Sequence, residues 1–418
     1  MRSLIEKDRQ HLWHPFTQMK GWMQEEPVII ESGHGAMLRD VEGREYIDAN
    51  SSIWTNLHGH QHPKITQAIK EQLDRIAHSS FLGLANVPAI ELAEKLSQLA
   101  GLPRVFYSDD GSTAMEVAIK MSLQYWQHCG QAWRNRFVAF TEAYHGDTLG
   151  AVSIGGIHLF HDAYRAVTFD VLRAGTIEQL AHLLQANAGN VAAVCIEPVI
   201  QGAAGMRLWP AGMLIEVRRL CNEHTVLLVV DEVMTGFGRT GTMFACEHEG
   251  VKPDLMAVAK GLTGGYMPLA ATLTTQEVFD AFLGDFTEFR TFFHGHSYTG
   301  NQLACAAALA NLRIFEEEHT LENLQPKIQA LKSHLDTCRS LPHVTDVRQC
   351  GFIGAVELGS FPVEAQMGMK VCQAMRDRGV LTRPIGNVIV IMPPYCITGD
   401  QMAKVFAALA ESIQAVVV

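Results

Sequence analysis

Short apolar runs alternate with longer helical patterns along most of this chain. Nearly continuous apolar runs, the pattern of parallel strands covered on both faces, occur at 104–108, 137–141, 191–199, 225–233 and 255–260. Helical patterns lie between several of them, for example at 113–128 and 210–224. The alternation predicts an α/β domain with a mainly parallel sheet.

The pattern changes toward the C-terminus. Helical stretches are predicted at 302–340, 364–378 and 399–416, with shorter apolar runs at 343–349, 352–358 and 388–394. This mixture is typical of a smaller α+β unit. We therefore expect three segments: residues 1–60, which pack with the small domain, residues 61–305 as the large domain, and residues 306–418 as the C-terminal small domain.

Composition narrows the class of protein. Of 418 residues, 48% are hydrophobic and 18% are charged, which is enough for a sizeable core. With 33 Lys and Arg against 44 Asp and Glu, the net charge of −11 repels phosphate backbones, so neither a nucleic-acid nor a membrane partner is expected. The nine cysteines are scattered without a CxxC pair, and no signal-peptide or membrane-spanning run is present. We expect a cytoplasmic protein with reduced thiols and no metal site.

Three of the predicted strands end in residues that can carry chemistry, and ligands of parallel sheets bind beyond these ends. Gly111-Ser112 opens a helix after the first run, where backbone N–H groups suit a phosphate, although taken alone the pattern favours a plain helix cap. Asp231 ends another run, either as a buried acid with a partner or as a capping acid. Lys260 ends a third, either as a buried nucleophile or as a surface lysine with a buried stem.

One cofactor requires all three features. Pyridoxal 5'-phosphate carries a phosphate, a ring nitrogen that a carboxylate keeps protonated, and an aldehyde that joins a lysine amine. Tyr144, which follows the run at 137–141, supplies an aromatic ring to stack on the cofactor. The residue pattern therefore indicates a pyridoxal-phosphate enzyme.

Several longer strings resemble a known family. VVDEVMTGFGRTG at 229–241, PDLMAVAKGLTGGYMPLAA at 253–271, IEPVIQGAAGM at 196–206 and AYHGDT at 143–148 are similar to the class III pyridoxal-phosphate aminotransferases. That resemblance implies a fold type I transferase acting as a homodimer. Four other strings further resemble the 8-amino-7-oxononanoate aminotransferases of biotin synthesis: HLWHPFTQM at 11–19, SSIWTNLHGHQHP at 51–63, FFHGHSYTGNQLACAAA at 292–308 and LTRPIGNVIVIMPP at 381–394. Members of that family make 7,8-diaminononanoate, with S-adenosylmethionine or lysine as the amino donor.

The resemblance also implies roles for individual residues. Lys260 would bind the cofactor covalently and carry the proton, Asp231 would hold the ring nitrogen, and Tyr144 would stack on the ring. The remaining implied cofactor ligands are Gly111 and Ser112, with His296 and Ser297 from the neighbouring subunit. The implied substrate pocket consists of Phe16, Ile53, Trp54, Tyr144, Lys260, Gly295 and Arg383, the last of which would bind a carboxylate.

Departures from the family patterns leave the substrates open. Met234 and Ala203 replace a glutamine and a glutamate that are common in relatives acting on two carboxylates, which disfavours a 2-oxoglutarate enzyme. Phe16 and Ile53 replace a tyrosine and a tryptophan of the adenosylmethionine-type pattern, so lysine competes as the expected donor. Three alternatives remain: a broad ω-amine:pyruvate aminotransferase, an aminomutase of the glutamate-semialdehyde type, and a non-enzymatic binding protein on the same fold.

Overall fold

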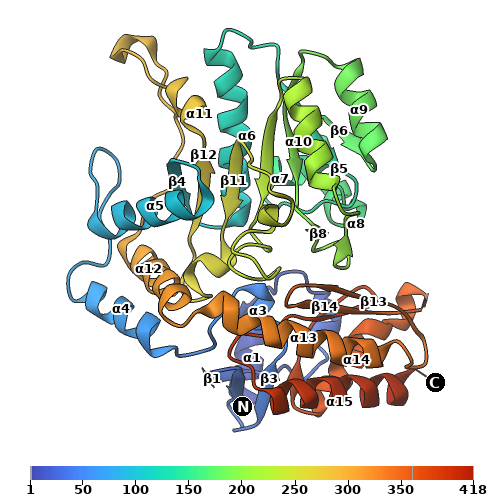
Figure 1. The fold of residues 1–418 in the computed structure, drawn as a ribbon. Helices are drawn as coiled ribbons and strands as arrows, with labels where there is room; N and C mark the ends of the chain where they lie inside the picture. The colour runs from blue at the N-terminus through green and yellow to red at the C-terminus, as the bar shows by residue number, and fades with distance from the viewer. Residues whose placement is uncertain (1, 360, 418) are drawn as a thin grey trace.

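A seven-stranded sheet forms the centre of the larger part of the molecule (Figure 1), in a computed structural model that describes residues 2–359 and 361–417. Its strands, in order across the sheet, are β4 (Arg104–Ser108), β12 (Ala270–Thr274), β11 (Leu255–Val258), β10 (Leu227–Asp231), β7 (Val191–Ile196), β5 (Arg136–Phe140) and β6 (Val171–Ala174). Only β12 runs antiparallel to its neighbours, and the other pairs are parallel. The α/β prediction with a mainly parallel sheet is confirmed.

Helices cover both faces of this sheet. One face carries α6 (Gly111–His128) and α7 (Leu149–Ile154), and the other carries α5 (Val87–Ala100), α9 (Ile177–Ala186) and α10 (Met213–Glu223). Along β5, Phe137 and Ala139 pack in one core cluster, whereas Val138 and Phe140 pack in the other. Burial on both faces is the physical reason for the nearly continuous apolar runs.

Two further four-stranded sheets form the smaller part of the molecule, which holds both termini (Figure 1). The first joins β1 (Ile30–His34), β2 (Met37–Asp40) and β3 (Glu45–Asp48) to β15 (Val380–Leu381), and the second contains β13 (Val344–Cys350), β14 (Ile353–Leu358), β17 (Val388–Ile391) and β16 (Pro384–Ile385). Because β3 pairs with β15 in parallel, the N-terminal segment and the C-terminal unit share one sheet.

The C-terminal helices differ in one respect from the predicted pattern. The continuous helical stretch expected over 302–340 is two helices, α12 (Gln302–Glu317) and α13 (Thr320–Cys338). His319 separates them with a φ of 47°, which no right-handed helix accommodates. The other helices of the smaller part are α14 (Met367–Asp377) and α15 (Gly399–Val416).

Short helical segments complete the fold. They are α1 (Arg2–His11), α2 (Met19–Trp22), α3 (Ser51–Trp54), α4 (Pro63–Leu73), α8 (His158–His161) and α11 (Gln276–Asp280), together with a two-stranded pair of β8 (Ile200–Gln201) and β9 (Arg207–Leu208). Helix α4 packs against α12. Within residues 2–359 and 361–417, none of the helices combines the length and the apolar content that a bilayer crossing requires.

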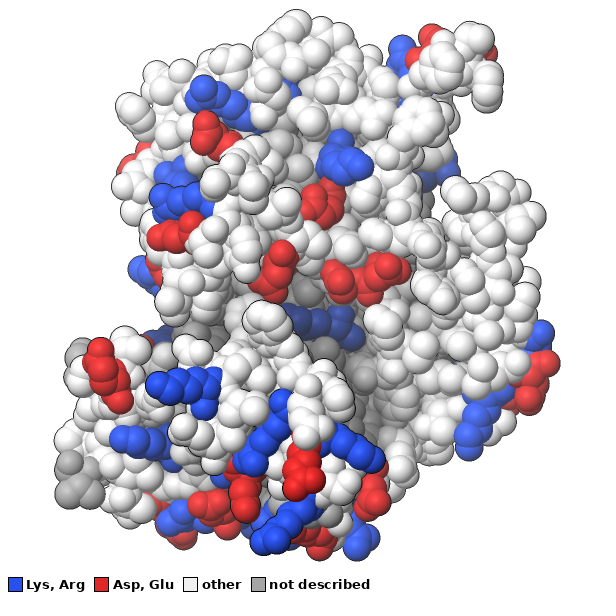
Figure 2. All heavy atoms as spheres, turned by 180° about the vertical axis from the view of Figure 1, so that it is seen from behind, with Lys and Arg blue, Asp and Glu red and all other residues white. Residues whose placement is uncertain are grey.

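The strand order brings distant chain segments to one edge of the large sheet. Asp231 at the end of β10 is paired with Ala257 on β11, so Lys260, three residues further on, begins beside it. The loops after β4, β5 and β7 leave from the same edge, because these strands run in the same direction. Figure 2 shows the surface hollowed between the larger and smaller parts, with acidic side chains along the upper margin of the hollow.

Candidate active site

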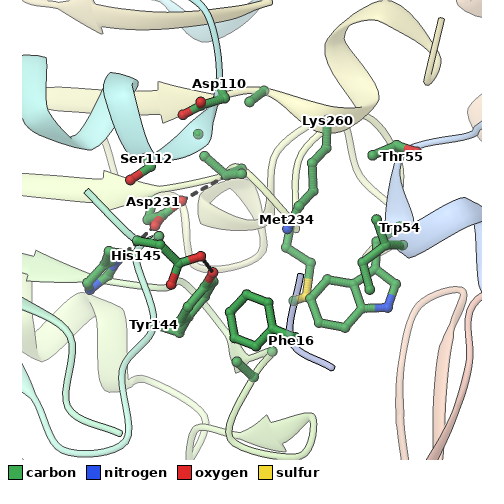
Figure 3. A pocket seen from close by; sticks show the side chains of 18 of the residues that line it. Phe16, Trp54, Thr55, Asp110, Ser112, Tyr144, His145, Asp231, Met234 and Lys260 are labelled. Atoms are coloured by element: carbon green, nitrogen blue, oxygen red, sulfur yellow. Dashed lines mark hydrogen bonds and ion pairs between the residues drawn. The ribbon is translucent and has the colours of Figure 1, made fainter. Parts of the chain in front are cut away.

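A cavity of about 1480 Å³ lies at this edge, between the two parts of the molecule. Typical small-molecule sites occupy roughly 300–1000 Å³, so the cavity has room for a cofactor and a substrate together. Of the residues predicted for the site, those that line it are Phe16, Ile53, Trp54, Gly111, Ser112, Tyr144, Asp231, Lys260 and Arg383. Figure 3 shows Asp231 and Tyr144 on one side of the open space and Lys260 and Trp54 on the other.

Lys260 begins a short 3₁₀ turn directly after β11. Its φ is 44°, a left-handed conformation that L-residues adopt at a cost and that often occurs at functional sites. The side-chain amide of Asn311 donates to the carbonyl oxygens of Gly261 and Leu262, both at 3.0 Å, and holds the turn in place. Burial lowers the pKa of Lys260, while the charges of Asp231 and Glu197 act in the opposite direction. An amine that loses its proton more readily is a better nucleophile.

Asp231 is buried and held in a fixed orientation. One oxygen accepts the backbone N–H of Val233 at 3.0 Å, and the other lies 2.7 Å from Nδ1 of His145. The His145 ring is also buried, and its Nε2 has no partner among the described residues. Sequence reasoning missed His145, although its place directly after Tyr144 in the AYHGDT string was a usable signal.

Gly111 and Ser112 form the first turn of α6. Within residues 2–359 and 361–417 their backbone N–H groups donate to no protein acceptor, and they line the cavity. A Cβ on Gly111 would come within 2.5 Å of Val233, and a Cβ on Gly146 within 2.5 Å of the Ser112 side chain. Ser112 Oγ and Thr148 Oγ1 lie 2.8 Å apart across this turn. The arrangement leaves free donors at a helix N-terminus, which suits an anion such as a phosphate.

Aromatic rings line the cavity on both sides of the open space (Figure 3). The Tyr144 hydroxyl donates to Asp147 at 2.7 Å, and burial, followed by this hydrogen bond, raises the pKa of Tyr144. The Phe16 ring meets Tyr144 edge-on with centroids 6.5 Å apart, and it meets Phe160 at 5.4 Å. Trp54 closes the other side, with its ring centre 4.8 Å from Nζ of Lys260. The wall therefore offers apolar and stacking surface beside the amine.

Glu197 is a second buried acid that sequence reasoning did not assign. It follows β7, lines the cavity, and accepts backbone N–H groups of Tyr144 at 3.1 Å and of Gly202 at 3.0 Å. Burial raises the pKa of Glu197 to about 7. The signal for it was an acid directly after the six apolar residues 191–196, similar to the signal that identified Asp231.

The remaining predicted residues lie at the margin or outside the cavity. Arg383 is exposed, lines the cavity, and donates to the backbone carbonyl of Phe16. Gly295, His296 and Ser297 are not brought to the cavity within one chain. His296 Nδ1 lies 3.7 Å from Asp109, which does line the cavity.

Comparison with known proteins identifies the family. The family model described as "Aminotransferase class-III" matches residues 19–413. The chain belongs to the class III aminotransferases. The adenosylmethionine-8-amino-7-oxononanoate aminotransferase of Geobacter sulfurreducens is 48% identical to this class III aminotransferase, over 99% of this chain and 98% of its own length. The enzyme of the same name from Aquifex aeolicus is 49% identical, over 99% of this chain and 97% of its own length. The crystal structure of the enzyme so named from Methanocaldococcus jannaschii has a TM-score of 0.98, with 44% identity and full coverage of both chains.

Class III aminotransferases depend on pyridoxal phosphate, so the predicted cofactor is confirmed. An amine transaminase from an uncultivated Pseudomonas species, 32% identical over 97% of this chain and 99% of its own, with a TM-score of 0.92, was solved in its pyridoxal-phosphate-bound form. The residues of the cavity fit this group. They provide the amine of the half-buried Lys260, a buried carboxylate on Asp231, and a helix N-terminus at Gly111 and Ser112, whose backbone N–H groups donate to no acceptor among the described residues.

Proposed function

We propose that this class III aminotransferase converts 8-amino-7-oxononanoate to 7,8-diaminononanoate in biotin synthesis. The observation that carries the proposal is the full-length identity of 48–49% to relatives named for that reaction. The cavity supports it, because an apolar and aromatic wall of Phe16, Ile53 and Trp54 leads to the cation of Arg383. A long aliphatic substrate with a terminal carboxylate matches such a cavity, because its chain can contact the apolar wall and its carboxylate can pair with the cation.

Within this proposal each residue has a defined task. Pyridoxal phosphate, when bound, supplies an electron sink for the carbon that bears the transferred amino group. Lys260 Nζ would hold the cofactor covalently between turnovers and would move the proton of the substrate carbon. Asp231, oriented by His145 and Val233, would keep a proton on the ring nitrogen. The N–H groups of Gly111 and Ser112 would bind the phosphate.

The same proposal includes a homodimer with shared sites. Segment 281–298 projects from the large sheet in Figure 1 and exposes large apolar side chains, among them Phe286, Phe289 and Phe293. Exposed apolar groups gathered in this way are typical of an interaction surface. In the proposed dimer Gly295, His296 and Ser297 of each chain complete the site of the other.

The division into domains and the cellular location belong to this proposal as well. Shared pairing between β3 and β15 supports grouping residues 1–60 with residues 306–418, and the seven-stranded sheet supports residues 61–305 as the large domain. No cysteine among the described residues forms a disulfide, which suits a reducing cytoplasm.

S-Adenosylmethionine is the proposed amino donor, because the relatives are named for it. Lysine is the alternative that Phe16 and Ile53 favour, since a hydroxyl and an indole that would contact an adenosyl group are absent.

A donor panel tests the proposed reaction. The purified enzyme receives 8-amino-7-oxononanoate with S-adenosylmethionine, lysine or a simple amine in separate reactions, and the diamine is detected by mass. We expect the diamine with S-adenosylmethionine and none with the Lys260→Ala variant. Product with lysine alone would reassign the donor. If simple amines react only when pyruvate replaces 8-amino-7-oxononanoate as acceptor, the ω-amine enzyme replaces the proposal, and turnover without any added amine would replace it by the aminomutase.

A further inference from the structure

The turn that carries Trp54 has an unusual backbone. Four consecutive non-glycine residues of α3 have positive φ angles: 47° for Ser51, 50° for Ser52, 72° for Ile53 and 69° for Trp54. The left-handed region brings Cβ too close to the following carbonyl oxygen, and it is least accessible to a β-branched residue such as Ile53. A turn of this kind persists only where its surroundings enforce it.

Asp48 holds the start of this turn through three hydrogen bonds. Its buried carboxylate accepts the backbone N–H groups of Asn50 at 3.2 Å and Ser52 at 3.1 Å, and also the Ser52 hydroxyl at 3.0 Å. Behind it, Nε2 of His60 lies 3.1 Å from the same carboxylate. One of these contacts is made to Asn50, directly before the turn, and two are made to Ser52 in its first half, so the carboxylate holds the chain where it enters the turn.

Two other contacts fix the ends of the turn. The Ser51 hydroxyl donates to the carbonyl of Met392 at 2.7 Å, and the Trp54 indole N–H donates to the Asn50 side chain at 3.0 Å. In this position the indole lies over the Lys260 amine, and Ile53 lines the cavity beside it. A right-handed or extended backbone would turn these side chains in other directions.

We propose that Asp48, backed by His60, is a positioning residue that holds Ser51–Trp54 in the left-handed turn and thereby determines how Trp54 and Ile53 shape the substrate cavity. The hydrogen bonds of Asp48 offset the backbone strain, and the result is a rigid wall beside Lys260. The proposal rests on the proposed function only for the choice of substrate in the kinetic assay.

Paired substitutions of Ser52 separate strain from hydrogen bonding. Ser52→Gly and Ser52→Ala both remove the hydroxyl that Asp48 accepts, but only glycine tolerates a φ of 50° without cost. We expect Asp48→Ala to lower the melting temperature, and Asp48→Ala/Ser52→Gly to melt about 2 °C above Asp48→Ala/Ser52→Ala. If the Asp48 variants fail to fold, Ser52→Gly is compared with Ser52→Ala in the otherwise unchanged enzyme. The glycine variant should again have the higher melting temperature.

Kinetics test the positioning role. Asp48→Ala is expected to raise KM for 8-amino-7-oxononanoate by about tenfold with a much smaller change in kcat, since the wall and not the reacting groups is displaced. In Asp48→Ala/Ser52→Gly the KM should fall part of the way back toward that of the unchanged enzyme, whereas in Asp48→Ala/Ser52→Ala it should not. Equal melting and equal KM for the two double variants would overturn the proposal. If the unchanged enzyme does not use this substrate, the proposed function fails, whereas the melting comparison still decides the role of the turn.

Discussion

Neutralising Glu197 should change how the stability of this enzyme depends on pH. The carboxyl lies in the cavity wall and accepts two backbone N–H groups, and its charge acts on Lys260, while the charge of Asp231 acts on it. Burial raises its pKa from the ordinary 4.5 to about 7, despite the opposing influence of His145. The perturbation is Glu197→Gln, which retains the size of the side chain and cannot ionise.

The size and sign of the effect follow from proton linkage. A raised pKa means that the folded protein binds this proton more tightly than the unfolded chain does. The resulting stabilisation is fully present below pH 4.5 and is lost as the pH rises through about 7. A shift of roughly 2.5 pKa units corresponds to about 3 kcal/mol of unfolding free energy across that window. The glutamine variant lacks this contribution to the pH dependence of the unfolding free energy. Its amide oxygen can accept only one of the two N–H groups.

Urea unfolding of the cofactor-free protein, at a fixed protein concentration and at several pH values from 4.5 to 8, measures the difference. Between pH 4.5 and pH 8, the unfolding free energy of the unchanged protein should fall by about 3 kcal/mol relative to that of Glu197→Gln. Glu178→Gln is the matched control, because Glu178 is exposed on the first turn of α9 and should leave the slope over pH 5–8 unchanged. Parallel pH profiles for the unchanged protein and Glu197→Gln would refute the reasoning.

Two further substitutions test the cofactor contacts. Lys260→Ala should abolish the visible absorbance of the lysine-linked cofactor. The control Lys332→Ala, at an exposed position of α13, should retain it. An absorbance band that persists in Lys260→Ala would contradict the assignment of Lys260 as the cofactor-linked lysine. Gly146→Ala should weaken cofactor binding by tenfold or more, about 1.4 kcal/mol, because its Cβ would lie 2.5 Å from Ser112. Gly130→Ala, also at positive φ but with no atom within 4 Å of the new Cβ, should bind the cofactor normally, and equal affinities in the two variants would contradict this explanation.

The local sequence was sufficient for the strands and for the chemistry at their ends. Apolar runs covered on both faces gave the positions of β5, β7, β10 and β11, because burial on two sides leaves no polar alternation to obscure them. Asp231 and Lys260 stood out for the same reason, as charged residues at or just beyond the ends of buried strands. The family strings then named the class of enzyme, which the comparison confirmed.

Other elements were not recognisable along the chain. Strand β12, Ala-Ala-Thr-Leu-Thr, has a single large apolar residue, and its antiparallel place between β4 and β11 carries no signal in the sequence. The break at His319 was hidden, because the helical pattern continues on both sides of a single residue with left-handed φ.

Only the tertiary structure decided which residues act together in the site. His145 meets Asp231 across 86 positions of sequence, and Glu197 ties the loop of Tyr144 to the turn at Gly202. Strand order determines such neighbours, and sequence periodicity reports the burial of a position but not its partner. The left-handed turn at Ser51–Trp54 is likewise decided by the tertiary structure. Its conformation opposes the intrinsic preference of its residues and is held by contacts with Asp48 and Met392.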